Sequence, residues 1–256
     1  MFAMGAETMS LPLSEKMEFE QGDDGMSFGY KASGANAVDE FGNLDSVEFI
    51  NVAQDDVLAW PNAVHRTYPR TVNARMDSTI VPFVKKSRAI NVVLLGVLEK
   101  KLGLPEGELL KKHSDEEPSG SETRCIKSPP RAPEDNKTTA IGAHTDFGSL
   151  VSRTVLLFPT YRADHTQSFL HNRLGGLQVM VPGTEEWQYV KVGATQTDCV
   201  QLLTANSTSQ SPGTQSVTLV RCSRYRFYLL AQIGLTGDAM SIFSGGILKS
   251  NLHRVV

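Results

Sequence analysis

The chain has 256 residues, of which 40% are hydrophobic and 21% are charged, and its formal net charge is −3. This composition supports a packed core in one large or two small domains. Lysines and arginines do not gather on one stretch, so nothing in the sequence indicates a nucleic-acid-binding surface. The three cysteines have no metal-ligand spacing and leave at least one without a partner, which favours a reducing compartment.

Membrane and secretory proteins are also disfavoured by the sequence. The apolar runs are too short and too interrupted to span a bilayer. Met1 is not followed by a charged segment and an apolar segment of the kind that makes a secretory signal. We therefore expect a soluble, cytoplasmic protein that binds neither nucleic acid nor membrane.

In residues 1–76, the sequence predicts one helical turn and one short strand. Pro12, followed by L-S-E-K-M, is typical of the start of a helix, and no helix is expected before it. Val47, Phe49 and Asn51 alternate with other residues in the manner of a short strand. Clusters of Gly and Asp between these segments indicate turns.

Residues 77–103 carry the clearest helical pattern in the chain. Apolar residues recur every three or four positions, lysines with Arg88 and Glu99 occupy the other face, and Gly103 is suited to end the helix. We expect a supporting helix packed on the core, then a second short helix over 104–113 and a polar loop over 114–122. The sequence R-C-I-K at 124–127 predicts a strand that leads into a turn at Pro129.

The sequence A-H-T-D-F-G-S-L, at 143–150, contains a candidate metal site. His144 and Asp146 are two residues apart, so in a strand both side chains point to the same face. His253 can join them only through folding. Two imidazoles and one carboxylate form the facial triad of non-haem Fe(II) oxygenases, which leaves three coordination positions open. The tripeptide H-x-D alone is a weak signal, and its surroundings strengthen it.

Two further blocks follow in order: L-G-G-L-Q-V-M-V-P-G-T-E-E-W-Q-Y-V at 174–190 and G-D-A-M-S-I-F-S-G-G-I-L-K-S-N-L-H-R-V-V at 237–256. With them the chain resembles the 2-oxoglutarate/Fe(II)-dependent dioxygenases, in the branch similar to isopenicillin N synthase, in pieces over residues 11–256. The resemblance implies a mainly β protein with supporting helices, built as a double-stranded β-helix or jelly roll. It also implies Fe(II) held by His144, Asp146 and His253.

The resemblance further implies 2-oxoglutarate as cosubstrate, O2 and a small-molecule substrate that is hydroxylated or otherwise oxidised. Residues 1–76 then form a partial N-terminal dioxygenase region, and residues 77–256 form the jelly-roll core. The family's first strand and its final strands have no counterpart in the sequence, so we expect a fold that is incomplete at both ends.

The residues that bind the cosubstrate are less clear. Plant-type relatives carry Asn-x-Tyr-Pro before the metal motif, and alignment on Pro129 places Ile126 and Ser128 there. Arg124 or Lys127 could supply a hydrogen-bond donor instead, although either could equally be a surface charge.

The family's Arg-x-Ser motif, which binds the far carboxylate of 2-oxoglutarate, lies a strand beyond the distal histidine. Here only Arg254, Val255 and Val256 follow His253, and in a strand Arg254 should point away from the metal. Removal of one side of a buried charge pair costs roughly 3–5 kcal/mol, which corresponds to more than about a hundredfold in affinity. We therefore expect iron binding with poor turnover of 2-oxoglutarate or none at all.

Two stretches, 151–167 and 193–236, have no counterpart in the family pattern. They lengthen the separation between Asp146 and His253 to 107 residues. Our hypothesis is that they are translated introns, and the alternative is that they are genuine family-specific loops. In either case we expect 151–167 and 193–218 to be exposed or outside the main sheet, with T-V-L-L-F at 154–158 the most strand-prone part.

Two other functional interpretations stay open at this point. The chain could be a catalytically incompetent dioxygenase remnant, from mis-splicing or truncation, that at most binds metal. The same three ligands could also hold zinc in a hydrolase, although no candidate general base lies near the motif. Of the neighbouring residues, we expect Phe147 in the core, with a place beside the iron as the alternative. We also expect Asp238 in a turn before a strand, and Gly245 and Gly246 in a tight bend.

Overall fold

The computed structural model describes residues 1–23, 25–128, 140–156, 177–181, 183–189, 199–206, 216–221 and 230–255. The chain forms two compact units, Met1–Asp135 and Asn136–Val256. The long helix expected in the jelly-roll core lies in the first of these units. The predicted division into family regions at residue 76 stays a prediction.

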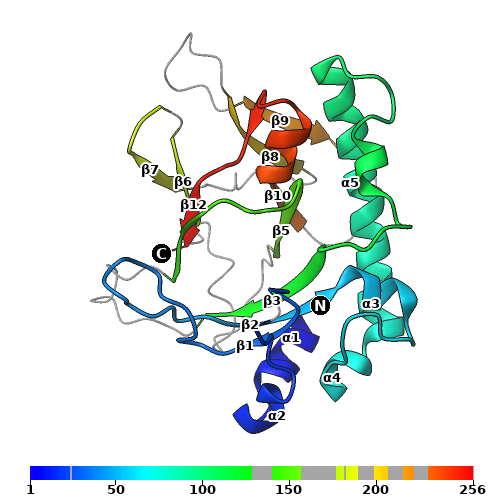
Figure 1. The fold of residues 1–256 in the computed structure, drawn as a ribbon, viewed down its shortest axis with the longest axis vertical. Helices are drawn as coiled ribbons and strands as arrows, with labels where there is room; N and C mark the ends of the chain where they lie inside the picture. The colour runs from blue at the N-terminus through cyan, green and yellow to red at the C-terminus, as the bar shows by residue number, and fades with distance from the viewer. Residues whose placement is uncertain are drawn as a thin grey trace. The chain divides into compact units, whose positions relative to one another are not determined.

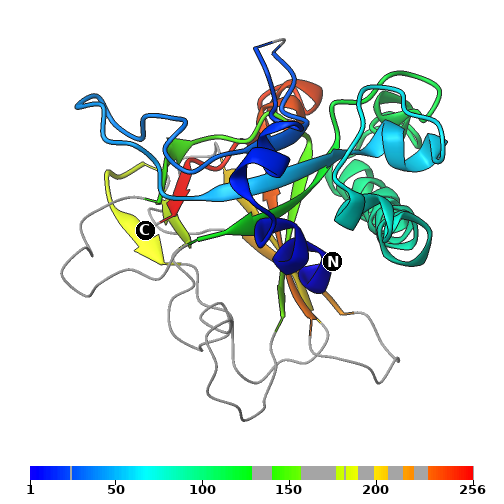
Figure 2. The same cartoon turned by 90° about the horizontal axis from the view of Figure 1, so that it is seen from below.

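The first unit is built around a three-stranded antiparallel sheet with the order β1 (Gly29–Lys31), β2 (Glu48–Ala53) and β3 (Glu122–Lys127). Helix α1 (Phe2–Met9) contacts β2 and β3, as Figures 1 and 2 show. The buried core of this unit consists of Met4, Met9, Tyr30, Ile50, Val52, Val57, Tyr68, Val72, Met76, Ile80 and Val84. The remaining helices are α2 (Leu13–Met17), α3 (Gln54–Ala59), α4 (Arg70–Asn73), the π-helix η1 (Met76–Ile80), α5 (Val81–Leu102) and the 3₁₀-helix η2 (Leu110–His113).

Most of the local predictions for this unit are confirmed. The helix start after Pro12 is α2, the alternating segment near Val47 is β2, and R-C-I-K lies in β3. Helix α5 ends at Gly103, whose φ of 67° is a left-handed conformation that a glycine adopts without steric cost.

Two local predictions are wrong. A helix, α1, does precede Pro12. Its apolar residues Met4 and Met9 are buried in the core, and this tertiary packing is not visible in so short a sequence. The second short helix is the single 3₁₀ turn η2, because the preceding Gly107 has a φ of 84° and interrupts a regular helix.

The described residues of the second unit form two sheets. One has the order β4 (Ile141–His144), β12 (His253–Val255), β6 (Leu177–Met180) and β7 (Trp187–Tyr189), and all its pairs are antiparallel. The other has the order β11 (Leu248–Lys249), β8 (Cys199–Asn206), β10 (Leu230–Thr236) and β5 (Leu150–Leu156), with β9 (Ser216–Arg221) also paired to β8. In the second sheet only the β8–β10 pair, among the residues described, is parallel. Helix α6 (Asp238–Phe243) joins β10 to β11.

Two short connections, both within the described residues, run from one of these sheets to the other. Residues 145–149 connect β4 of the first sheet to β5 of the second, and residues 250–252 connect β11 of the second sheet to β12 of the first. The described residues are therefore mainly β in this unit, with antiparallel sheets and supporting helices in the chain as a whole.

Where the structure describes residues 151–167 and 193–218, the expectation that they lie outside the main sheet is wrong, whereas the alternative expectation, that they are exposed, stays a prediction. Residues 151–156 belong to the edge strand β5, and β8 (Cys199–Asn206) lies between β11 and β10. Both strands contain β-branched and other apolar residues, such as T-V-L and V-Q-L-L, which favour strand pairing. Residues 157–167, 193–198 and 207–215 lie outside the described residues, and the intron hypothesis stays a prediction.

Within the residues that the structure describes, no helix combines the length and the apolar character needed to cross a membrane. The longest helix, α5, carries lysines, an arginine and a glutamate along its length.

The buried carboxylate of Glu99, near the end of α5, leads to a prediction about the stability of the protein at acidic pH. It accepts backbone N–H groups from Leu110 (3.0 Å), Gly107 (3.0 Å) and Leu109 (2.6 Å). These hydrogen bonds, the one from Leu110 above all, hold the pKa of Glu99 below its ordinary value despite the opposing effect of burial. A carboxyl group whose pKa is lower in the folded than in the unfolded state stabilises the fold at pH values above its unfolded-state pKa. This stabilisation is lost as the pH falls through the folded-state pKa.

We therefore expect the melting temperature of Glu99→Gln to fall less between about pH 5 and about pH 2 than that of the wild type. At pH 7 the variant should melt at a lower temperature, because a neutral amide accepts these hydrogen bonds less strongly. Circular dichroism melts across this pH range measure both effects. The control is Glu108→Gln, whose carboxylate pairs with Lys111 at the surface and which should follow the wild type. Equal slopes for Glu99→Gln and the wild type would contradict the assignment.

Candidate metal centre

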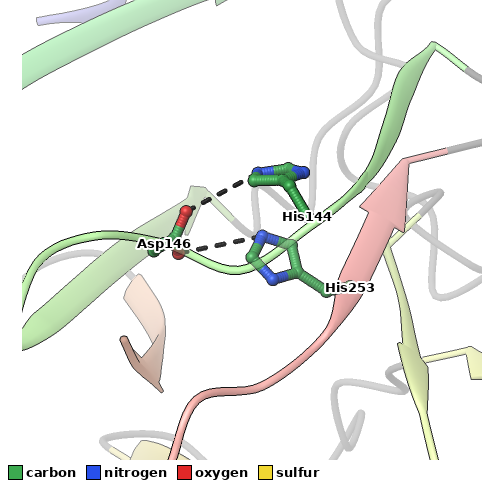
Figure 3. A group of neighbouring side chains, drawn as sticks. All are labelled: His144, Asp146 and His253. Atoms are coloured by element: carbon green, nitrogen blue, oxygen red, sulfur yellow. Dashed lines mark ion pairs between the residues drawn. The ribbon is translucent and has the colours of Figure 1, made fainter. Parts of the chain in front are cut away.

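The structure brings His144, Asp146 and His253 together (Figure 3). His144 ends β4 and His253 begins β12, and the two residues are direct cross-strand partners in the antiparallel pair. Asp146 lies in the connection that follows β4. Its Oδ1 is 3.6 Å from Nε2 of His144, and its Oδ2 is 3.7 Å from Nε2 of His253. The two imidazole ring centroids are 4.3 Å apart.

The backbone determines which imidazole nitrogen faces the carboxylate. Nδ1 of His144 lies 2.8 Å from the carbonyl oxygen of Gly142, and Nδ1 of His253 lies 2.9 Å from that of Asn251. A carbonyl oxygen only accepts hydrogen bonds, so each Nδ1 carries a proton and donates it. In the neutral imidazole the lone pair is then on Nε2, on the side of Asp146. Ring orientation through such a carbonyl contact is the usual arrangement for metal-binding histidines.

The dimensions of the cluster are close to those of a coordination sphere. The candidate ligand atoms all lie within 4.8 Å of one another. Two donors at right angles around an ion, with bonds of about 2.1 Å, are separated by about 3.0 Å. The two imidazole–carboxylate distances of 3.6 and 3.7 Å exceed this by about 0.6 Å, a difference that side-chain rotation can close. The donor set, two neutral imidazoles and a carboxylate, therefore fits a divalent metal ion.

The three side chains differ strongly in their exposure. His253 is buried, with 2% of its side chain exposed, whereas the side chains of Asp146 and His144 are 20% and 38% exposed. An ion between them would have protein on the His253 side and an accessible side near His144. This asymmetry is compatible with open coordination positions for other ligands.

Sequence reasoning missed a close approach between Gly237 and the segment that carries Asp146. A Cβ atom at position 237 would lie 2.1 Å from the carbonyl oxygen of Gly148 and 2.4 Å from that of Asp146. The next residues of α6 use their N–H groups here: Asp238 donates to Asp146 (2.8 Å) and Ala239 donates to Phe147 (3.1 Å). The resemblance of G-D-A-M to the family pattern was the only signal of this contact in the sequence.

Several residues beside the motif were also predicted from the sequence. Phe147 was expected in the core, and this is wrong: it is 89% exposed, because the turn after Asp146 directs it outward. Asp238 begins helix α6 rather than lying in a turn before a strand. Gly245 and Gly246 do form a tight turn, with φ values of 63° and 81°.

Arg254 contacts Gln178 (2.7 Å) and stacks on the Trp187 ring, while the neighbouring His253 points to the opposite face.

The two candidate cosubstrate residues lie in the first unit and have partners there. Arg124 donates to Asn51 (2.8 Å) and Glu122 (2.5 Å) and lies over the Phe49 ring, and Lys127 pairs with Glu48 (3.0 Å). Ile126 and Ser128, which occupy the family's Asn and Tyr positions, are described, whereas Pro129 lies outside the described residues. A role for Arg124 or Lys127 in cosubstrate binding stays a prediction.

Comparison of the sequence with family models and with curated proteins finds no match. Comparison of the structure with solved structures does find similar folds. A full-length Neurospora crassa protein in complex with alpha-KG has a TM-score of 0.62 and 17% identity, over 100% of this chain and 63% of that chain. A second crystal structure of that protein, with alpha-KG and 5-formyluracil, has a TM-score of 0.61 and 17% identity, over 100% of this chain and 62% of that one. A putative 2OG-Fe(II) oxygenase family protein from Caulobacter crescentus has a TM-score of 0.60 and 20% identity, over 99% and 65% of the two chains.

These neighbours confirm, for the fold, the resemblance to the 2-oxoglutarate/Fe(II) oxygenases that the sequence indicated. The isopenicillin N synthase-like branch stays a prediction. The chain spans less than two thirds of the length of each of these three structures, between 62% and 65%.

The close approach at Gly237 leads to a stability prediction. Gly237→Ala places a methyl group against two carbonyl oxygens, so we expect destabilisation of about 1–3 kcal/mol from overpacking. The control is Gly96→Ala in the middle of α5, where a Cβ meets no atom within 4 Å. That substitution should stabilise the helix by about 0.5–1 kcal/mol. Urea unfolding of the purified variants measures both changes, and wild-type stability of Gly237→Ala would refute the close packing of this turn.

Proposed function

We propose that this chain is the core of an Fe(II)- and 2-oxoglutarate-dependent oxygenase that oxidises a small molecule. The observation that carries the proposal is the geometry of His144, Asp146 and His253, with both Nε2 atoms facing one carboxylate and both Nδ1 protons anchored on backbone carbonyls. The fold similarity to a 2OG-Fe(II) oxygenase family protein, and to a protein crystallised with alpha-KG, supports the choice of iron and 2-oxoglutarate over other divalent-metal chemistry.

The two sheets of the second unit are assigned, in this proposal, to the double-stranded β-helix of that family. The crossings at 145–149 and 250–252 join one sheet to the other, and these connections, with the strand ends beside them, carry all three ligands. Such an arrangement is expected of a jelly roll whose site lies between its sheets. Membership in the isopenicillin N synthase-like branch belongs to the same proposal and rests on the sequence blocks at 174–190 and 237–256.

Each protein residue has a defined task in this proposal. His144, Asp146 and His253 hold the iron on one side, and the carbonyls of Gly142 and Asn251 keep the two imidazoles oriented. Bound iron supplies the redox chemistry that couples oxidative decarboxylation of 2-oxoglutarate by O2 to oxidation of the substrate. The exposed side of His144 is where small molecules would gain access. Arg124 or Lys127 remains the proposed donor to the cosubstrate.

The first test is anaerobic Fe(II) binding by the purified chain. We expect one tightly bound iron per chain and, in Asp146→Ala and in His253→Ala, an affinity weaker by at least about tenfold, since each variant removes one of three protein ligands. The matched control is His65→Ala, because His65 also faces a carboxylate, Asp55 at 3.0 Å, in the first unit. Equal iron affinity in the wild type and Asp146→Ala would refute the ligand assignment.

The second test is succinate formation from 2-oxoglutarate by the iron-loaded chain in the presence of O2. The rate should be measured over a wide range of cosubstrate concentrations. We expect iron-dependent succinate formation that is abolished in Asp146→Ala and retained in His65→Ala. Tight binding of iron without succinate at any concentration would contradict the enzymatic proposal and leave only the metal site.

A further inference from the structure

The two chain segments that contain or adjoin the candidate metal ligands both contact one residue, Asp238. The first segment, 145–149, follows His144 and contains Asp146, and the second, 250–252, leads directly into His253. Asp238 is the first residue of α6, after the end of β10, and belongs to neither segment. Its position between them is not apparent from the sequence, where it is 93 residues from Thr145 and 12 residues from Ser250.

Each oxygen of the Asp238 carboxylate accepts a hydrogen bond from a different ligand-bearing segment. The Thr145 hydroxyl donates to Oδ2 at 3.0 Å, from the residue between His144 and Asp146. The Ser250 hydroxyl donates to Oδ1, three residues before His253. The backbone N–H of Asp238 also donates to the carbonyl oxygen of Asp146 at 2.8 Å. One residue thus contacts both segments, of which the first contains Asp146 and follows His144 and the second precedes His253.

The segment before His253 is tied to the same junction by its backbone. Asn251 donates its N–H to the carbonyl oxygen of Thr236 (3.1 Å) and its side-chain amide to the Thr236 hydroxyl (3.2 Å). The carbonyl of Asn251 in turn accepts the Nδ1 proton of His253. A shift of the 250–252 segment would therefore reorient the His253 ring, and a shift of the 145–149 segment would displace Asp146.

We propose that Asp238 is a positioning residue for the metal site: its carboxylate couples the two ligand-bearing segments, so that His253 is held in register with His144 and Asp146. The inference rests on the metal site of the proposed function. Charge-assisted hydrogen bonds are about twice as strong as neutral ones, so a carboxylate is well suited to this task. Groups that orient metal ligands from outside the coordination sphere typically change metal affinity by about 10–100-fold when they are removed.

A merely structural role for Asp238 makes a different prediction. In that case its loss would lower the melting temperature, but the protein that remains folded at low temperature would bind metal as the wild type does. Co(II) is a suitable probe, because its visible absorption reports both its affinity and the geometry of its ligands. The measurement is a Co(II) titration of the full chain at low temperature, with folding checked by circular dichroism.

We expect Asp238→Ala to weaken Co(II) affinity by about 10–100-fold and to alter the visible spectrum. Asp238→Asn should lose less, because its amide can accept from one hydroxyl and donate to the other. The matched control is Ile242→Ala, on the exposed side of the same helix, which should bind Co(II) as the wild type does. Wild-type affinity and spectrum in folded Asp238→Ala would overturn the inference.

Single hydroxyl deletions test the coupling without removing the carboxylate. Thr145→Val and Ser250→Ala should each weaken Co(II) binding, and neither should weaken it further in the Asp238→Ala background, because the shared acceptor is already gone. If Asp238→Ala does not fold, wild-type affinity in both hydroxyl variants overturns the inference. Failure of the wild type itself to bind Co(II) would instead refute the metal site, so the two failures are distinguishable.

Discussion

The candidate site depends on one pairing, that of β12 with β4. This pairing places His253 directly opposite His144, although the two residues lie at opposite ends of the second unit's sequence. On its other side β12 pairs with β6, where His253 lies opposite Val179, so β12 is held between two neighbours. A slip of one residue would turn His253 to the other face of the sheet, where Arg254 now lies against Trp187. The geometry of the triad is therefore a consequence of strand register.

Groups around the three candidate ligands restrain the side-chain orientations that strand register alone does not determine. A change of register between His144 and Ile141 places an extra residue in β4, and the carbonyl of Gly142 in this irregular part orients the His144 ring. Gly237 allows the start of α6 to approach the carbonyls of Asp146 and Gly148, an approach that any Cβ would prevent. Backbone carbonyls, a glycine and the Asp238 carboxylate thus hold three side chains whose own torsions would otherwise be free. In the proposed metal site, these groups would preorganise the ligands without contacting the ion themselves.

Much of the local structure and the identity of the three ligand candidates could be predicted from the sequence. Helix α5 and strands β2 and β3 follow from periodicity and turn residues. The three ligand candidates follow from the resemblance of the H-x-D block and the C-terminal block to the oxygenase family, because H-x-D alone is a weak signal. Register and tertiary contacts could not be predicted, because they depend on partners far away in the chain. The inclusion of β8 inside a sheet, the exposure of Phe147 and the bridge through Asp238 are all of this kind. Propensity marked 154–158 as strand-prone, but it neither predicted the strand at 199–206 nor indicated which strands would pair with it.

X-ray absorption on the iron-loaded chain tests the central claim most directly, because it reports the ligands of the ion itself. The account predicts nitrogen and oxygen scatterers at about 2.0–2.2 Å, with the multiple-scattering pattern of two imidazoles. It also predicts that His253→Ala reduces that pattern to one imidazole, whereas His65→Ala leaves it unchanged. A sulfur scatterer at about 2.3 Å, or two imidazoles that persist in His253→Ala, would contradict the account.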